Sequence, residues 1–437
     1  MNNSSLRLWG CLALALCSLL PLRAQTAREL IEEDPTRIAC QQHHYEVPVI
    51  RDTPPPAGFK PFYVSHFGRH GSRYHTSARP FAPTMAVFRE MEQKGLLTDT
   101  GRIVMHIVDT LWKVHEGMGG YLTQKGSREQ QGVAERLYAR FPRIFRQKDR
   151  RDVLAVSSTV VRCNQSMMNF CTALKGESPA LDFHYYTNGR TDETLTRVQH
   201  GGRNPSFPPV DNSMEKVDSI KRARMDASAF ARRMFTDSTA AAACLVDGNM
   251  PAFMTQILNH CVVDQCLDEP VPAIYPYFTM DEMFNYWVYR NAASLNAHGF
   301  SYENGEALRR VGKFIVTDIL EKADEALQEG STKCADLRFS HDGGVLPLMF
   351  YLRLEGNDET WHLGEEWEHG WYAFQQIPMC TNVQMIFYRN RRGEVLVKFL
   401  HNERETTITR LKPWKGPYYR WSDLRPYLAE LAAADCD

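Results

Sequence analysis

The sequence has no excess of charge of either sign. Its 51 lysines and arginines face 52 aspartates and glutamates, so the formal net charge is -1 at pH 7. A near-neutral chain has no long-range field to attract nucleic acid or an anionic membrane, and any anion must be bound by a local cluster of cations. We therefore expect no nucleic-acid partner. Internal repeats and low-complexity tracts are also absent, which is typical of an ordinary globular protein.

Long apolar runs are missing after the first 24 residues, so we expect no stable membrane span. The opening residues carry Arg7, an apolar run from Leu8 to Leu22, and Ala24 before Gln25. This order is typical of a secretory signal peptide, and the run is shorter than the ~20 apolar residues that a permanent anchor needs. We predict a signal peptide over residues 1–24 and export to the periplasm or out of the cell.

Cysteines are too sparse for a disulfide scaffold. Two of the eleven lie in the predicted signal peptide, which leaves nine in the rest of the chain. An odd number leaves at least one cysteine unpaired within a monomer, and the spacing does not reveal the connectivity of the others. No Cys-x-x-Cys pair occurs, which excludes the usual zinc-ribbon and thioredoxin motifs.

Three segments share one pattern: a β-rich run, a few polar or glycine residues, and then apolar residues at helical spacing. The β-rich runs cover residues 62–68, 152–158 and 337–340. In open α/β sheets, ligands bind beyond the carboxyl ends of the strands, so we expect the residues that follow the three runs to converge. The charged residues at these junctions are Arg69, His70, Arg73, Arg162, His341 and Asp342.

The pattern predicts an α/β fold in which helices flank a Rossmann-like core sheet. We assign residues 25–180 and 331–437 to this core, and residues 181–330 to a smaller, mainly helical cap inserted into it. Helical spacing at 280–295 and 307–327 supports the cap, whereas the helical stripes within 85–145 could join either part. Alternating apolar residues on both sides of 390–393 predict a β-hairpin.

The five residues from Arg69 to Arg73 place two guanidinium groups around one imidazole, with Gly71 allowing close approach of a ligand. Arginine donates two parallel hydrogen bonds to phosphate oxygens, so Arg69, Arg73 and Arg162 would neutralise a transferring phosphoryl group. The surrounding cations lower the pKa of His70 and keep a nitrogen lone pair available to attack phosphorus. His70 is therefore our candidate nucleophile, acting through a phosphohistidine.

The leaving oxygen of a phosphate monoester also needs a proton, and Asp342 is the best-placed acid. As a carboxylate it could then activate the water that hydrolyses phosphohistidine, while His341 would donate to the phosphate. We expect an optimum at acid pH because Asp342 must be protonated, with its ordinary pKa of about 3.9 raised by burial. No metal and no cofactor are expected, because the arginines supply the positive charge.

The stretch from Arg69 to Arg73 resembles the Arg-His-Gly-x-Arg hallmark of the histidine acid phosphatase family. Residues 157–166 are similar to the family's later arginine block, and His341 with Asp342 corresponds to its His-Asp pair. Residues 120–126 resemble its Gly-x-Leu-Thr-x-x-Gly element, and residues 402–403 its Asn-Glu block. Together these cover residues 60–175 and 335–405. The resemblance implies a phosphoric monoester hydrolase with His70 and Asp342 as catalytic residues and the three arginines and His341 around the phosphate.

Within the family, Arg162 with Cys163 and residues 341–348 and 385–388 look most like multiple inositol polyphosphate phosphatases. Those enzymes generally carry His-Ala-Glu where this chain has His341, Asp342 and Gly343. The proton donor here therefore follows the pattern of acid phosphatases and bacterial phytases. Inositol phosphates (phytate among them), sugar phosphates and nucleotides all remain open as substrates, and the oligomeric state is also open.

Two other functions use the same residues. A binding protein could hold a phosphorylated ligand without turning it over, although it has no use for a nucleophile paired with an acid. A phosphomutase of the same superfamily would protect its phosphohistidine from water. Release of inorganic phosphate without an acceptor alcohol would distinguish a phosphatase from both.

Other histidines are expected to have ordinary roles. His66 lies four residues before His70, but a strand does not put the two on one helical face, so we do not expect a metal pair. We expect His43 and the acidic and histidine residues within 362–369 to be solvated. A contact of His75 with the leaving group is left open.

Overall fold

The computed structural model describes residues 25–195, 198–199, 202–203, 214–304 and 308–435. The predicted signal peptide at residues 1–24 lies outside these described residues. Within them, no helix is both long enough and apolar enough to cross a membrane.

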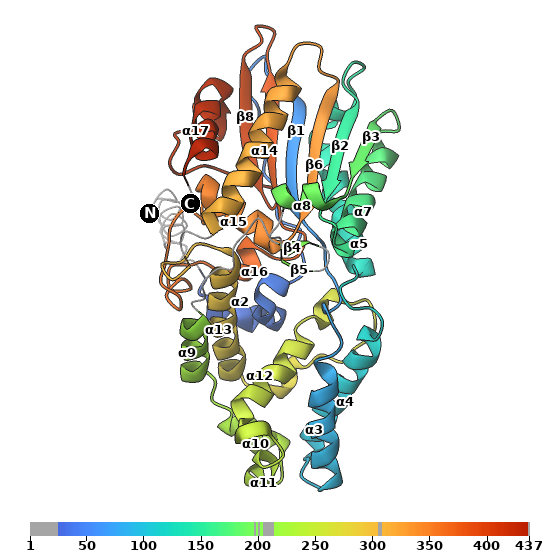
Figure 1. The fold of residues 1–437 in the computed structure, drawn as a ribbon, viewed down its shortest axis with the longest axis vertical. Coiled ribbons are helices and arrows are strands. Elements are labelled where there is room, and N and C mark those ends of the chain that lie inside the picture. Colours follow the sequence, from blue (N-terminus) through green and yellow to red (C-terminus); the bar gives the residue numbers. More distant parts are fainter. Residues whose placement is uncertain (1–24, 196–197, 200–201, 204–213, 305–307, 436–437) are drawn as a thin grey trace, which may run out of the picture.

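A mixed sheet fills the upper half of the molecule in Figure 1. Its strand order is β10-β8-β7-β1-β6-β2-β3, and β9 pairs with β8. The strands β1, β6, β2 and β3 run parallel, whereas β7, β8 and β10 are antiparallel to their neighbours. The strands are β1 Lys60–Arg69, β2 Asp152–Ser157, β3 Asp182–Tyr186, β6 Lys333–Ser340, β7 Asn382–Arg389, β8 Val395–His401, β9 Arg404–Thr406 and β10 Tyr418–Arg420. Two short strands, β4 Val198–Gln199 and β5 Gly202–Arg203, pair with each other.

The parallel register places three strand ends side by side. Arg69 at the end of β1 is opposite Ser340 at the end of β6, and Ser157 at the end of β2 is opposite Phe339. The residues that follow these strands therefore leave the sheet at the same edge, as expected for an open α/β sheet.

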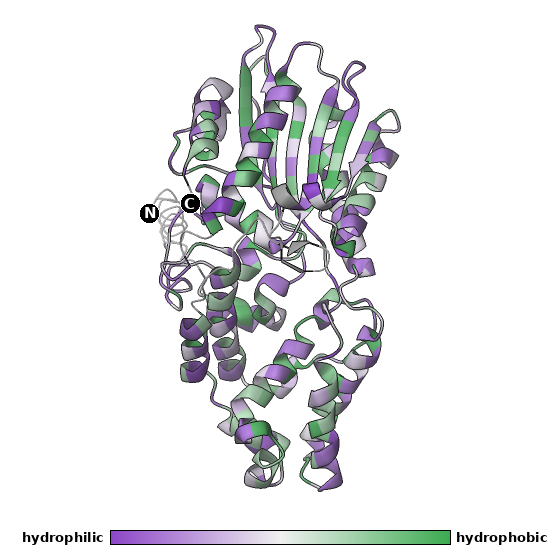
Figure 2. Cartoon of the chain, viewed as in Figure 1, coloured by the Kyte–Doolittle hydropathy of each residue, from purple (hydrophilic) through white to green (hydrophobic). Residues whose placement is uncertain are grey.

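Helices cover both faces of the sheet, and Figure 2 shows green apolar bands along the strands. The helices α5, α6 and α7 pack on one face, around a core that includes Val133, Phe170 and Leu337. The helices α14, α15 and α17 pack on the other face. Their bounds are α5 Gln124–Arg140, α6 Pro142–Phe145, α7 Val161–Glu177, α14 Arg309–Leu327, α15 Asp342–Leu352 and α17 Trp421–Ala433.

The lower half of Figure 1 is helical. Its elements are α2 Ala27–Glu33, α3 Phe81–Gln93, α4 Asp99–His115, α9 Met214–Arg224, α10 Ser228–Met234, α11 Ser238–Ala242, α12 Met250–Cys261, α13 Met280–His298 and α16 Ala373–Gln376. Short 3-10 helices are η1 Pro35–Gln42, η2 Val246–Gly248, η3 Asp264–Cys266 and η4 Tyr275–Tyr277. The start of α13 follows from the sequence, since Thr279 caps this helix in a capping box with Glu282.

The predicted α/β class with a helix-flanked sheet is confirmed, and so is the hairpin, which is β7 paired with β8. Two elements of the segment expected to form the cap lie in the sheet layers instead. Residues 182–186 form β3 because they pair in parallel with β2, and α14 packs on α15 and α17. Conversely, α3 and α4 pack on α10 and α12, away from the sheet.

Candidate active site

His70 follows β1, and its backbone amide donates to the carbonyl of Ser340 at 2.9 Å. Its ring Nδ1 lies 2.9 Å from the carbonyl oxygen of Gly71, which can only accept. Nδ1 therefore holds the proton of the neutral ring, and Nε2 carries the lone pair. Burial lowers the pKa of His70 well below its ordinary range, and Arg162 and Arg69 lower it further. The lowered pKa favours the neutral form of the imidazole.

Two glycines allow the loop after His70 to rest on the first turn of α5. A Cβ at Gly71 would lie 2.5 Å from the carbonyl oxygen of Gly126, and a Cβ at Gly126 would lie 2.1 Å from that of Ser72. The Thr123 hydroxyl donates to the Ser72 carbonyl at 3.1 Å and caps α5 by accepting from the Gly126 amide at 3.1 Å. Glu129 accepts from the amide and the hydroxyl of Ser72, both at 2.7 Å. The loop after His70 is thus held at several points.

Three guanidinium groups gather around this loop. Arg69 is fully buried, and its Nη2 donates to Asp342 Oδ2 at 2.8 Å. Burial, together with repulsion from Arg162 and Arg69, lowers the pKa of Arg73 to about 9. Cations that repel one another in a buried place are stabilised by a bound anion, and arginine suits phosphate.

His341 joins the cluster from the end of β6. Its ring lies edge-on to that of His70, with 5.4 Å between centroids. Arg162 Nη2 lies 3.2 Å from His341 Nδ1, and Ser158 Oγ lies 3.2 Å from His341 Nε2. Because a guanidinium only donates, Nδ1 accepts and the proton sits on Nε2, toward Ser158. The expected donation from His341 to phosphate stays a prediction, since a phosphate would have to compete with Ser158 for this proton.

Asp342 is the first residue of α15, and its carboxylate faces Arg69. Its Oδ1 also lies 3.6 Å from Nε2 of His298, the last residue of α13. Burial alone would raise the pKa of Asp342, but Arg69 and then His298 outweigh it and hold the pKa well below its ordinary range. Our expectation of a raised pKa is therefore wrong for the unliganded protein, because the ion pair with Arg69 stabilises the carboxylate.

The structure thus brings all six predicted residues to one edge of the sheet. In a comparison with known families, the model of the histidine phosphatase superfamily, branch 2, matches residues 64–402. The chain belongs to this superfamily. It is a phosphatase, and the family match extends through every element that contributes to the cluster.

Solved structures share the fold of this phosphatase. The multiple inositol polyphosphate phosphatase of Bifidobacterium longum, in complex with inositol hexasulfate, superposes with a TM-score of 0.75 at 18% identity, covering 92% of this chain and 98% of that chain. The phytase from D. castellii gives a TM-score of 0.67 at 15% identity, covering 95% of this chain and 88% of that chain. No curated protein matches the sequence of this phosphatase.

His298 was not predicted from the sequence of this phosphatase. It lies in the segment expected to form the cap, and it reaches Asp342 only because α13 ends beside α15. His75 points elsewhere: its Nε2 lies 2.9 Å from the carbonyl oxygen of His260. His66 is buried against Phe170 and Phe339.

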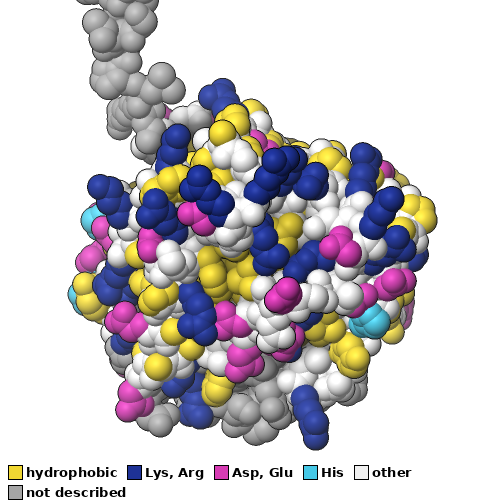
Figure 3. All heavy atoms as spheres, turned by 90° about the horizontal axis from the view of Figure 1, so that it is seen from above, with side chains coloured by type: hydrophobic (Ala, Val, Ile, Leu, Met, Phe, Trp, Pro, Cys, Tyr) yellow, Lys and Arg dark blue, Asp and Glu magenta, His cyan; other side chains and the backbone are white. Residues whose placement is uncertain are grey.

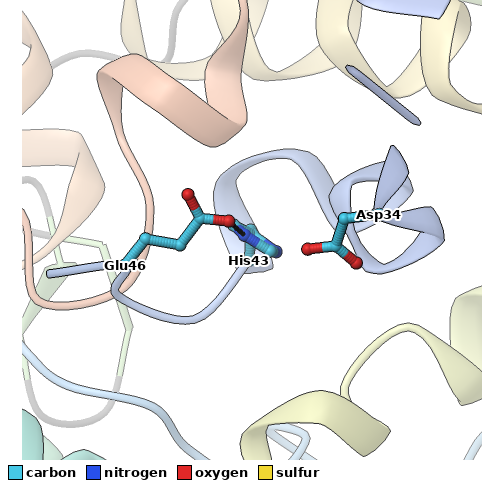
Figure 4. A group of neighbouring side chains, drawn as sticks. All are labelled: Asp34, His43 and Glu46. Atoms are coloured by element: carbon cyan, nitrogen blue, oxygen red, sulfur yellow. Dashed lines mark hydrogen bonds and ion pairs between the residues drawn. The ribbon is translucent and has the colours of Figure 1, made fainter. Parts of the chain in front are cut away.

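A second group, Asp34, His43 and Glu46, brings three possible metal-ligating side chains together (Figure 4). His43 is buried, so our expectation that it is solvated is wrong. Asp34 caps η1 by accepting from the amide and hydroxyl of Thr36 at 3.0 and 2.7 Å. Glu46 lies 3.0 Å from His43 Nε2 and also accepts from Arg37 at 3.3 Å. These hydrogen bonds explain the group as one that holds η1 to the residues on either side of it.

Glu366 was expected to be solvated and is instead fully buried. Its carboxylate accepts from the amide of Gly364 at 2.7 Å and from the side chain of Asn291 at 3.1 Å. Burial raises its pKa to about 7 despite these two donors. The sequence did not predict this burial, because Glu366 lies in a run of charged residues. Local composition does not show that one side chain of such a run faces inward.

Proposed function

We propose that this phosphatase hydrolyses small phosphate monoesters through a phosphohistidine at His70, without a metal or cofactor. The observation that carries the proposal is the hydrogen bond from His70 Nδ1 to the Gly71 carbonyl, which leaves Nε2 as the basic atom. The cations around this ring suit a phosphoryl group as it approaches Nε2.

In the first step Nε2 attacks phosphorus and the bond from phosphorus to the ester oxygen breaks. Arg69, Arg73 and Arg162 neutralise the oxygens of the transferring group, while Asp342 passes its proton to the leaving oxygen. A bound phosphate dianion raises the pKa of Asp342, because it brings negative charge nearby and competes for Arg69. The low pKa in the unliganded protein is thus compatible with proton donation in the substrate complex.

In the second step a water molecule attacks the phosphohistidine. Asp342, now a carboxylate, accepts a proton from this water, and the bond from phosphorus to nitrogen breaks to release inorganic phosphate. The same group therefore donates in one step and accepts in the other. Hydrolysis without an acceptor alcohol distinguishes this reaction from a mutase.

Inositol phosphates are the substrate class that we propose first. The Bifidobacterium longum enzyme was solved with inositol hexasulfate and with phosphate, and its fold covers most of this chain. We also propose that the helices between β3 and α14 act as the cap that shapes the substrate pocket. A panel of inositol, sugar and nucleotide phosphates at pH 4 to 7 would rank these classes.

Trapping the intermediate tests the reaction. We expect rapid alkaline quenching of the enzyme with radiolabelled substrate to yield labelled phosphohistidine, and His70→Ala to abolish both label and turnover. As a matched control, His184→Ala replaces an exposed histidine on β3, and we expect it to retain both. Label that persists in the His70 variant would overturn the assignment.

We further propose export directed by residues 1–24. N-terminal sequencing of the protein purified from the periplasm or medium should begin at Gln25. A mature protein that starts at Met1 inside the cell would contradict this.

A further inference from the structure

A cavity of about 990 Å³ opens at the edge of the sheet opposite the one that carries the catalytic cluster. It is formed by the start of β1, the segment between α6 and β2, and the turn that joins β7 to β8. These elements lie at the top of Figure 1, whereas His70 follows the other end of β1. In the view onto this end, Figure 3 shows Lys and Arg side chains around a hollow.

The cavity is basic although the chain as a whole is near neutral. Two acids also line it, Asp149 and Glu394. Its cations are Lys60, Arg143, Arg150, Arg389, Arg391 and Arg392. In the part of the chain that the structure describes, no side-chain ion pair within 4.0 Å involves any of these six cations. Most surface cations can be neutralised by nearby acidic side chains. A cluster of cations without such ion pairs therefore favours the binding of an anionic ligand.

Two of the cations are held in place at the base of the cavity. Arg150 and Arg389 lie over the ring of Phe62, with their Cζ atoms 5.2 and 4.3 Å from its centroid. Arg150 also donates to the carbonyl oxygens of Lys333 at 2.6 Å and Ala326 at 2.7 Å. Burial lowers the pKa of Arg150, and repulsion from Arg389 lowers it further. These side chains are therefore ordered before any ligand binds, which reduces the entropy cost of binding.

We propose that this basic cavity binds a small polyanion, a molecule bearing several phosphate or sulfate groups, at a site separate from the catalytic one. Forked guanidinium groups match phosphate and sulfate oxygens in pairs. The volume suits a ligand of the size of a substituted sugar or inositol ring. A membrane surface is disfavoured, because the cations line a hollow rather than a protruding face. The inference does not rest on the proposed catalytic mechanism.

Calorimetric titration with inositol hexasulfate, which a phosphatase does not hydrolyse, tests the site. We expect the wild-type protein to bind two equivalents, one in the catalytic cluster and one in the basic cavity. The variant Lys60→Glu/Arg391→Glu/Arg392→Glu changes three exposed residues and should lose one equivalent. We expect about tenfold weaker binding at the cavity for each cation removed.

The matched control reverses three exposed cations between β9 and β10, outside both proposed sites: Arg410→Glu/Lys412→Glu/Lys415→Glu. It changes the net charge equally and should keep both equivalents. Both triple variants should retain wild-type Tm and kcat/KM for an aryl phosphate. Arg73→Ala should lose the equivalent bound at the catalytic cluster and keep the one bound in the cavity. A failure of the catalytic proposal would be detected separately, by measuring turnover.

Three outcomes would overturn the inference. One is a cavity variant that binds as many equivalents as the wild-type protein, with unchanged affinity. Another is an equal loss in both triple variants, which would indicate a net-charge effect. In the third, the wild-type protein binds vesicles of anionic phospholipid and the cavity variant does not, while both bind hexasulfate equally. This result would assign the cations to a membrane surface.

Discussion

Replacing Asp342 with asparagine would separate proton donation from anion binding. The amide keeps the size of the side chain but has neither the acidic proton nor the charge. A positioned general acid contributes about a hundred- to ten-thousand-fold in rate. We therefore expect kcat on an alkyl phosphate to fall by about that factor, because an alkoxide is a poor leaving group. A nitrophenyl ester needs little protonation, and its kcat should fall less than about tenfold.

The same variant leaves Arg69 without its ion-pair partner. The side chain of Arg69 is 1% exposed and that of Asp342 is 19% exposed. Breaking a buried pair from one side costs about 3 to 5 kcal/mol, and the partial exposure of Asp342 puts the expected loss of unfolding free energy at the low end. Inorganic phosphate should restore more stability to the variant than to the wild type, since Arg69 is then free to bind it.

Steady-state kinetics on both esters, with thermal unfolding in the presence and absence of phosphate, check both effects. Asp423→Asn is a matched control, because it makes the same change at an exposed position in the first turn of α17. Equal losses on the alkyl and the aryl ester would refute the acid role of Asp342, whatever the stability data show.

Three further predictions follow from the structure. Gly126→Ala should lower kcat/KM at least about tenfold, because its Cβ would displace the Ser72 backbone; Gly176→Ala, whose Cβ meets nothing within 4 Å, should be silent. Burial raises the pKa of Glu366 from 4.5 to about 7. The stabilising contribution of this group is therefore complete below pH 4.5 and is lost as pH rises to 7. Urea unfolding should show that the free energy of unfolding falls by about 3 kcal/mol between these pH values, and Glu366→Gln should abolish this fall. Phosphate release should be unchanged by EDTA, and a loss that added metal reverses would contradict metal independence.

The sequence alone predicted the fold class and the convergence of six residues. Both predictions depend on local patterns, because a β-rich run followed by a helical stripe fixes the strand direction, and parallel strands end at one edge. The register of Arg69 opposite Ser340 then brings His70 and His341 together. The hairpin was equally readable, since its alternation is strict on both sides of a turn.

The remaining features depend on contacts between distant segments. The burial of His43 and Glu366, and the approach of His298 to Asp342, come from packing that no periodicity encodes. The shift in the pKa of Asp342 was predicted in the wrong direction. The sequence indicated that this residue is buried, but it did not reveal the ion pair with Arg69. The sequence did not indicate that residues 182–186 form a strand, because β3 is exposed on most of its length and lacks a strong strand pattern.

The position of β1 in the sheet has a consequence for how the chain matures. This strand is made early, yet its two neighbours, β6 and β7, are separated from it by more than half of the chain. During synthesis the edges of β1 stay unpaired until β6 and β7 have been made. Such long-range pairing is slow and leaves the nascent chain prone to aggregation. A ribosome-bound fragment that ends before Asn382 should be inactive and dependent on chaperones, although it contains both His70 and Asp342.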